Sequence, residues 1–271
     1  MTPPGRPEVV TAAPLADRSV LVGRLRAAGC VYAEDEADLL LAAAESPAAL
    51  AELTDRRVAG EPLEYLLGWA EFCGLRIAVD AGVFVPRGRT ALLVEAAASV
   101  TGAAAAVVDL CCGSGATTVA LAHRLAPRWL AAADIDPAAV ACARRNLAGL
   151  AAEVYEGDLF APLPPRWRGQ LDLVVANAPY VPTDAVALMP PEARLHEAPV
   201  ALDGGPDGLA VLRRVAAGAA HWLAPGGHLV VEVSVVQADA LCAALDAVGL
   251  EPDVRHDEDL DATAVTARRL R

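Results

Sequence analysis

The residues best suited to chemistry form the stretch Asn177-Ala-Pro-Tyr180, where a short apolar run ends at an amide side chain, a proline and an aromatic ring. Residues 171–176 are mostly apolar, which predicts a buried parallel strand, and Asn177 would then stand at its carboxyl end. Ligands of open α/β sheets bind at that edge. Pro179 fixes its own φ, and Tyr180 supplies a flat apolar face with a polar tip. The same residue types also make an ordinary strand-ending turn, so the rest of the chain has to decide.

A second candidate site is the glycine-rich turn Asp109-Leu-Cys-Cys-Gly-Ser-Gly115, between a predicted strand at 104–110 and a predicted helix at 117–125. Glycine lets a ligand lie against bare backbone, and the start of a helix offers unpaired N–H groups. Another predicted strand ends at Asp134, 19 residues after Gly115. An acidic side chain at about this spacing binds a ribose hydroxyl, so the pattern predicts a nucleoside-containing cofactor.

Two cofactor classes fit this pattern, a dinucleotide and S-adenosylmethionine. A dinucleotide fingerprint needs a third small residue, at the position where this chain has Thr118. S-adenosylmethionine has no phosphate and carries an ammonium and a sulfonium, which suit a pocket next to the acidic Asp109. The sequence therefore favours S-adenosylmethionine, with S-adenosylhomocysteine as the product. Asp158 could accept a hydrogen bond from the adenine amino group while Phe160 contacts the ring, or this pair could belong to a surface turn.

Composition argues against several other functions. A net charge of −13 disfavours binding along a nucleic-acid backbone, which needs clustered positive charge. The six cysteines have no paired C-x-x-C spacing, so neither a zinc site nor a secreted disulfide framework is predicted. No apolar segment is long enough for a membrane span, and the first residues lack an apolar signal core. We expect a cytoplasmic monomer without metal, membrane contact or direct nucleic-acid binding.

Periodicity predicts an α/β protein with a Rossmann-like sheet and a smaller module before it. Residues 1–67 are expected to form an N-terminal helical domain, with a flexible lead at 1–15 and either a docking or a lid function. Residues 68–86 are expected to form a linking β-hairpin with its turn near residues 80–82. Residues 87–271 are the predicted catalytic domain.

The catalytic domain is expected to alternate strands and helices. Strands are predicted at 104–110, 129–133, 154–155, 171–176, 228–233 and 263–268, and helices at 89–99, 117–125, 137–147, 208–223 and 235–248. Segment 181–205 is too long for an ordinary connection, so it is either disordered or a loop that shapes the substrate site. The role of His196 within it stays open between a structural and a catalytic residue.

Six motifs together resemble the N5-glutamine methyltransferases that modify peptide-chain release factors. They are Val85-Pro-Arg-Gly-Arg-Thr90, Asp109-Leu-Cys-Cys-Gly-Ser-Gly115, Asp134-Ile-Asp-Pro137, Gly157-Asp-Leu-Phe160, Asn177-Ala-Pro-Tyr180 and Ala201-Leu-Asp-Gly-Gly-Pro-Asp-Gly-Leu209. The likeness runs from about residue 64 to the end and implies a class I methyltransferase that uses S-adenosylmethionine. It also implies a release factor as the protein partner and a glutamine N5 as the methylated atom.

The resemblance implies a role for each matching residue. It assigns catalysis to Asn177, Ala178, Pro179 and Tyr180. It assigns cofactor binding to Asp109, Cys111, Gly113, Gly115, Asp134, Ile135, Asp158, Leu159, Phe160 and Asn177. It assigns substrate binding to Asn177, Tyr180, Pro86, Arg87 and Glu197, and it implies no metal.

The chain departs from the family pattern at three places. Ala178 and Ala198 each stand where the family has a proline. Gly88-Arg89 stands where the family usually has a proline and an acid. The predicted chemistry survives at Ala178, because that position contributes a backbone carbonyl. Asn177 Oδ1 and this carbonyl are two acceptors for one amide NH₂. Methylation of a small-molecule amide or amine, and a cofactor-binding protein without turnover, remain the alternatives.

Overall fold

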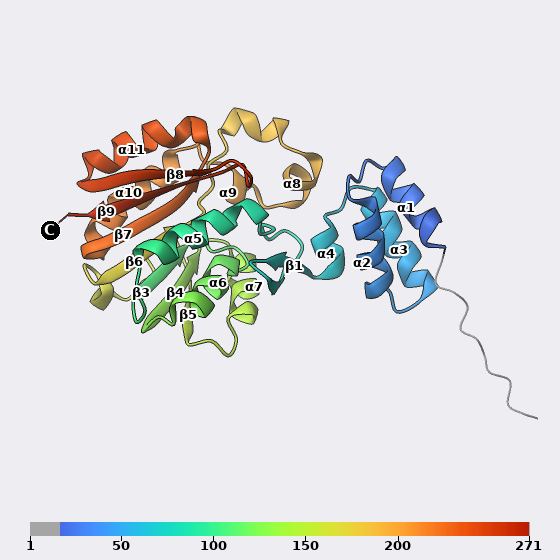
Figure 1. The fold of residues 1–271 in the computed structure, drawn as a ribbon, viewed down its shortest axis with the longest axis horizontal. Coiled ribbons are helices and arrows are strands. Elements are labelled where there is room, and N and C mark those ends of the chain that lie inside the picture. The colour runs from blue at the N-terminus through green and yellow to red at the C-terminus, as the bar shows by residue number, and fades with distance from the viewer. Residues whose placement is uncertain (1–16, 271) are drawn as a thin grey trace, which may run out of the picture. The chain divides into compact units, whose positions relative to one another are not determined.

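The structure is a computed structural model that describes residues 17–270, so the expected flexible lead at residues 1–15 lies outside the described residues. The chain divides into two compact units, which meet between Leu67 and Gly68 in the sequence (Figure 1). Among residues 17–67 the helices are α1 (Arg18–Ala27), α2 (Ala33–Ala43), α3 (Pro47–Val58) and α4 (Leu63–Leu67). Ser46 caps α3 by accepting a hydrogen bond from the N–H of Ala49. The helices bury a small leucine and alanine core, which fits the predicted helical spacing.

A β-hairpin opens the second unit, but its turn is not where the sequence suggested. Strands β1 (Trp69–Phe72) and β2 (Leu75–Ala78) are joined by Cys73 and Gly74, whose φ values are 52° and 74°. A two-residue turn of type I′ needs positive φ at both positions. The prediction of a turn near residues 80–82 was therefore wrong. The apolar run at 83–85 reflects burial of Val83 and Val85 in an irregular segment rather than strand pairing.

Within residues 68–270 a seven-stranded sheet has the order β5-β4-β3-β6-β7-β9-β8. Its parallel strands are β3 (Ala106–Leu110), β4 (Trp129–Asp134), β5 (Ala152–Glu156), β6 (Leu171–Ala176) and β7 (Leu223–Val233). The strands β8 (Leu250–Asp257) and β9 (Ala262–Arg269) are antiparallel additions. The predicted α/β class is confirmed. The central parallel strands β3, β4 and β6 are mostly apolar because both of their faces are covered.

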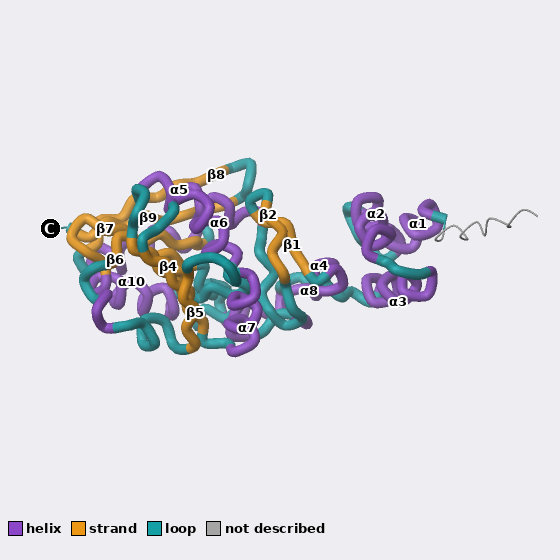
Figure 2. Tube along the Cα trace, turned by 90° about the horizontal axis from the view of Figure 1, so that it is seen from below, coloured by secondary structure: helices purple, strands orange, loops and turns teal. Residues whose placement is uncertain are grey.

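Helices cover both faces of the sheet (Figures 1 and 2). One face packs against α5 (Ala91–Val100), α6 (Ala116–Leu125) and α7 (Pro137–Asn146), and the other against α10 (Ala210–Trp222) and α11 (Ala238–Ala247). Successive side chains of β3 point to opposite faces of the sheet. Val107 packs in the core on the side of α5, α6 and α7, and Val108 packs on the side of α10 and α11. Asp136 caps α7 by accepting from the N–H of Ala138, with Pro137 in the first turn, as the sequence indicated.

Several boundaries differ from the predictions. The segment 181–205 is not structureless, because it contains a 3₁₀ turn (Thr183–Leu188) and the short helices α8 (Pro191–His196) and α9 (Pro199–Leu202). A 3₁₀ turn at Gly88–Thr90 precedes α5, and another at Val235–Gln237 precedes α11. A further 3₁₀ turn lies at Pro165–Trp167. Strand β7 starts five residues before the predicted strand and includes the Pro225-Gly-Gly stretch, where its register with β6 shifts.

Strand β8 was missed because its sequence does not alternate between apolar and polar residues. It lies at the edge of the sheet, and most of its residues are exposed. Edge strands carry charged residues that discourage pairing with other chains, and β8 contains Glu251, Asp253 and Arg255. No helix in the described stretch 17–270 has both the length and the apolar character needed to cross a membrane.

Candidate active site

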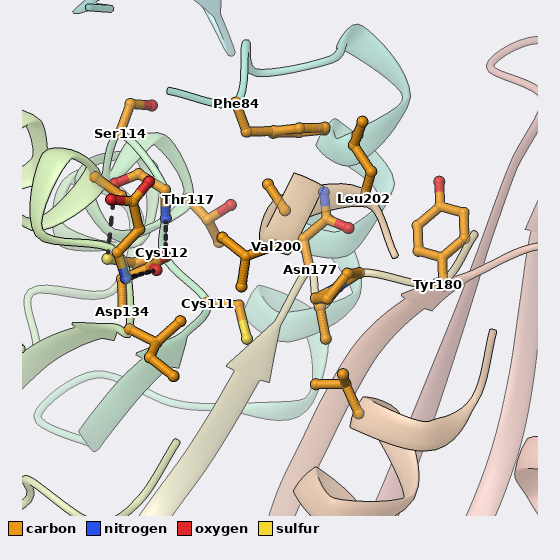
Figure 3. A pocket seen from close by; sticks show the side chains of 18 of the residues that line it. Phe84, Cys111, Cys112, Ser114, Thr117, Asp134, Asn177, Tyr180, Val200 and Leu202 are labelled. Carbon is orange, nitrogen blue, oxygen red and sulfur yellow. Dashed lines mark hydrogen bonds between the residues drawn. The ribbon is translucent and has the colours of Figure 1, made fainter. Parts of the chain in front are cut away.

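One pocket lies at the carboxyl ends of the central parallel strands, and its cavity volume is about 220 Å³. Asp109 is near the end of β3, Asp134 ends β4, and Asn177 directly follows β6. Because β4, β3 and β6 are neighbours in the sheet, these three residues line one cavity. Figure 3 shows Asp134 and Asn177 in it. From the sequence we expect the residues at three successive strand ends, Asp134, Asp158 and Asn177, to share one crevice, and all three line this pocket.

Most of the predicted site residues line this pocket, and three do not. The lining includes Pro86, Arg87, Asp109, Cys111, Gly113, Asp134, Ile135, Asp158, Leu159, Asn177, Ala178, Pro179 and Tyr180. The three that do not line it are Gly115, Phe160 and Glu197. His196 does not line it either.

Asp134 holds the glycine-rich turn in place. Its Oδ2 accepts from the backbone N–H of Gly113 at 2.8 Å, and its Oδ1 accepts from that of Asp136 at 2.9 Å. Burial raises the pKa of Asp134. Both carboxylate oxygens keep further acceptor positions, so Asp134 can bind a ligand hydroxyl in the geometry that the turn imposes.

Asp109 is a nearly completely buried acid at the pocket wall, with 1% of its surface exposed. The hydroxyl of Thr118 donates to its Oδ2 at 2.6 Å. Burial raises the pKa of Asp109 to about 7, against the opposing effect of the Thr118 hydrogen bond. Thr118, which breaks the dinucleotide fingerprint, therefore serves as a partner for this acid.

Gly115 supports the pocket from outside. It caps the amino terminus of α6 with a φ of 80°, and an added Cβ would lie 3.2 Å from the Cβ of Ala143 on α7. The residue therefore lets two helices approach closely, which is a packing function rather than a contact with the cavity.

Phe160 does not point into the pocket, which corrects the expected contact with an adenine ring. Its ring stacks on Trp222 in the core, with centroids 5.7 Å apart. Gly218 on α10 leaves the room for this ring, because a Cβ there would lie 2.3 Å from it. The neighbouring Leu159 lines the pocket instead, and Asp158 forms an ion pair with Arg214, another lining residue.

Asn177 has a fixed amide orientation. Its Nδ2 donates to the hydroxyl of Thr90 at 3.2 Å, which leaves its Oδ1 available as an acceptor. Figure 3 shows Asn177 between the loop of Asp134 on one side and Tyr180 on the other. Sequence reasoning did not single out Thr90, although this residue belongs to one of the matching motifs.

The backbone of the tetrapeptide is held by a glycine-rich turn and a glutamine. The amide of Gln237 donates to the carbonyl of Tyr180 at 3.0 Å. A Cβ on Gly204 would lie 2.7 Å from the carbonyl oxygen of Pro179, and one on Gly208 would lie 2.2 Å from that of Tyr180. These glycines, which belong to the motif at 201–209, are needed because the two backbones touch.

Two buried glutamates bind arginines of the segment 87–89. Arg87 donates to Glu197 Oε1 at 2.6 Å, and the backbone N–H of Val85 donates to the same oxygen at 3.1 Å. Arg89 donates to Glu232 Oε1 at 3.3 Å. Glu197 thus supports the pocket wall through Arg87, which differs from the expected direct contact with substrate.

Glu232 is a functional candidate that sequence reasoning missed. The hydroxyl of Tyr180 donates to its Oε1 at 3.0 Å. Burial, together with the Glu232 carboxylate, raises the pKa of Tyr180, so its hydroxyl stays protonated and can donate. A signal was present, because Glu232 is the acid that interrupts the apolar end of β7.

Comparisons with known proteins agree on the class of this chain. Residues 74–211 match the family model described as the methyltransferase small domain. A release factor glutamine methyltransferase of Geobacter sulfurreducens is 40% identical over 207 residues, which cover 76% of this chain and 72% of that protein. One of Mycolicibacterium smegmatis is 42% identical over 231 residues, which cover 83% and 81%.

Solved structures extend the comparison to the fold. A methyltransferase from Pyrococcus furiosus has a TM-score of 0.57 with 13% sequence identity, over 73% of this chain and 91% of that one. At this identity the likeness concerns the fold alone, and it supports the Rossmann-like sheet described above.

Proposed function

This chain belongs to the family of release factor glutamine methyltransferases, and we propose that it methylates the N5 amide of a glutamine in a peptide-chain release factor. The predicted family and reaction class, an S-adenosylmethionine-dependent methyltransferase, are confirmed by these relatives. The observation that carries the proposed acceptor is the amide of Asn177, which is fixed by Thr90 so that its oxygen remains an acceptor inside the pocket.

The pocket residues fit S-adenosylmethionine. The raised pKa of Asp109 marks a buried acid whose ionised form has no cationic partner among residues 17–270, and a positively charged ligand would supply one. Asp134 is oriented to accept from a ribose diol, and Asp158 and Leu159 line the part of the pocket suited to adenine. When bound, S-adenosylmethionine supplies an electrophilic methyl group on a sulfonium.

The chemical problem is the acceptor nitrogen, because an amide delocalises its lone pair into the carbonyl. Asn177 Oδ1 and the carbonyl of Ala178 accept the two N–H bonds of the acceptor amide and direct its nitrogen toward the cofactor side. Orientation of this kind can supply a large part of a rate enhancement. No strong base is required before transfer, since the nitrogen becomes acidic as it forms its new bond.

The proposed partner also gives a function to the helical unit of residues 17–67. A protein acceptor has a surface beyond its glutamine, and a separate helical unit offers an area to bind it. We assign docking to this unit and place the protein in the cytoplasm, where release factors act. The substrate named for the two relatives supports the same assignment.

The decisive experiment uses labelled S-adenosylmethionine with a purified release factor and with the same factor carrying Gln→Asn at its methylated position. We expect label in the first protein and none in the second. Asn177→Ala should lower kcat about 100-fold or more while the cofactor Kd stays within twofold, because a lost transition-state contact lowers turnover. Gln170→Ala is the matched control, because it removes an exposed amide outside the pocket.

Two outcomes would contradict the proposal. Label that enters a small molecule of the cell extract, with none in the release factor, would indicate a small-molecule amide or amine as the acceptor. Undiminished turnover by Asn177→Ala would remove this side chain from the acceptor site.

A further inference from the structure

A buried charge lies directly behind the acceptor end of the pocket. The side chain of Glu232 is 5% exposed, and its Oε1 accepts from both Tyr180 and Arg89. Its Oε2 is buried and has no hydrogen-bond partner among residues 17–270. A buried carboxylate is costly unless it is paired, so the guanidinium of Arg89 is the group that offsets this cost here.

The same short turn reaches both ends of the tetrapeptide. Thr90 fixes Asn177 by accepting from its amide. The adjacent Arg89 reaches Tyr180 through Glu232, and its guanidinium also acts on the Tyr180 hydroxyl directly by opposing the rise in pKa that burial causes. Both residues belong to the 3₁₀ turn Gly88–Thr90. The spacing of the amide and the aromatic ring in the pocket is thus set by one element outside the tetrapeptide.

We propose that Arg89 is a positioning residue for methyl transfer, which acts through Glu232 to hold the ring of Tyr180 against the acceptor amide. The inference rests on the proposed function, because it gives Tyr180 an amide to contact.

Removal of the guanidinium has a defined consequence. Glu232 would remain buried with the tyrosine hydroxyl as its described partner, and the carboxylate would lose the positive charge that holds it in place. Tyr180 would lose its fixed position, while the pocket wall at Asp109 and Asp134 would be unaffected. Misorientation of an acceptor lowers kcat more than it changes the binding of the cofactor.

The test is a double-mutant cycle on the complete chain, with Arg89→Gln, Tyr180→Phe and the double variant. We expect Arg89→Gln to lower kcat about tenfold with a change in acceptor KM below about threefold. Adding Tyr180→Phe should then lower kcat by less than about twofold more, because residues that act through a shared partner are not additive. Arg89→Lys should recover most of the activity, since it keeps the positive charge.

Arg87 provides a matched control, because it also pairs with a buried glutamate but has no described contact with Tyr180. The effects of Arg87→Gln and Tyr180→Phe on kcat should therefore multiply. Multiplicative effects in the Arg89 cycle would overturn the proposal, as would a Lys variant no better than the Gln variant.

A spectroscopic measurement decides the same question without any acceptor. With ¹³C at the ring Cζ of tyrosine, the resonance that disappears in Tyr180→Phe identifies Tyr180. That resonance should move in Arg89→Gln and stay in place in Arg87→Gln. An unmoved resonance in Arg89→Gln would refute the role of Arg89, whereas absent turnover of a release factor by the unaltered protein would refute the proposed function instead.

Discussion

Affinity for S-adenosylmethionine should rise between pH 6 and pH 7.5, because Asp109 ionises over this range. The pKa of Asp109 in the free protein is raised to about 7 by burial. A cationic ligand favours the ionised carboxylate, so binding lowers this pKa and must release a proton wherever Asp109 is protonated beforehand. Affinity therefore increases with pH until the pKa of the free protein has been passed.

The size of this change in affinity follows from the fraction of Asp109 that is ionised in the free protein. With a pKa of about 7, roughly one tenth of Asp109 is ionised at pH 6 and roughly three quarters at pH 7.5, so the association constant should rise about eightfold. This corresponds to about 1.2 kcal/mol of binding free energy. At pH 6 nearly one proton should be released for each cofactor bound.

Isothermal titration calorimetry in two buffers of different ionisation enthalpy measures both the affinity and the released protons. The cofactor's own ammonium has a pKa of about 8, so the comparison is with Asp109→Asn, whose affinity carries the same contribution from that ammonium. The variant should bind with a nearly constant Kd below pH 7.5. Parallel pH profiles for the two proteins, or no excess proton release by the unaltered protein, would refute the reasoning.

Three further predictions concern the support of the tetrapeptide. Thr90→Val removes the hydroxyl that orients Asn177 and keeps the size of the side chain at position 90, so steady-state kcat should fall about tenfold while the cofactor Kd is unchanged. An unchanged kcat would show that the Asn177 amide needs no such partner. Gly208→Ala should lower the free energy of unfolding, measured in urea, by about 3 kcal/mol, because its Cβ would lie 2.2 Å from a carbonyl oxygen. The control Gly226→Ala has a similar φ but a nearest neighbour at 4.0 Å, so it should lower this free energy by about 1 kcal/mol, and equal losses would contradict the steric argument. Ala178→Pro should keep or raise kcat on a release factor, because proline confines the preceding residue to extended backbone; a loss on the native acceptor would indicate a pocket shaped for another molecule.

The part of the site that the sequence predicted depends on local rules. Parallel buried strands are apolar throughout, so the polar residues Asp134 and Asn177 could be recognised as strand ends. Because such ends share one edge of the sheet, their meeting in a pocket followed from topology. The start of α7 at Asp136 and Pro137 followed from capping chemistry in the same way.

The remaining features depend on contacts between distant segments. The burial of Phe160 is set by Gly218, which lies on a helix far along the chain, and the motif around Phe160 carries no sign of it. The pairing of Arg89 with Glu232 joins residues 143 positions apart. The hairpin turn at Cys73 needs a positive φ, which a cysteine seldom adopts. The residue types therefore favoured a turn near residues 80–82 instead.

The position of β9 has a consequence for the order in which the protein becomes active during synthesis. A ribosome delivers β7 and β8 first, yet the sheet order puts β9 between them. Until residues 262–269 have emerged, β7 therefore has an open edge on the side where its Glu232 later lies opposite Ala264. The segment that completes the environment of Glu232 is thus the last strand of the described chain to be made. A nascent chain can assemble β3, β4 and β6 early, but it acquires the finished wall behind Tyr180 only when translation of β9 is complete.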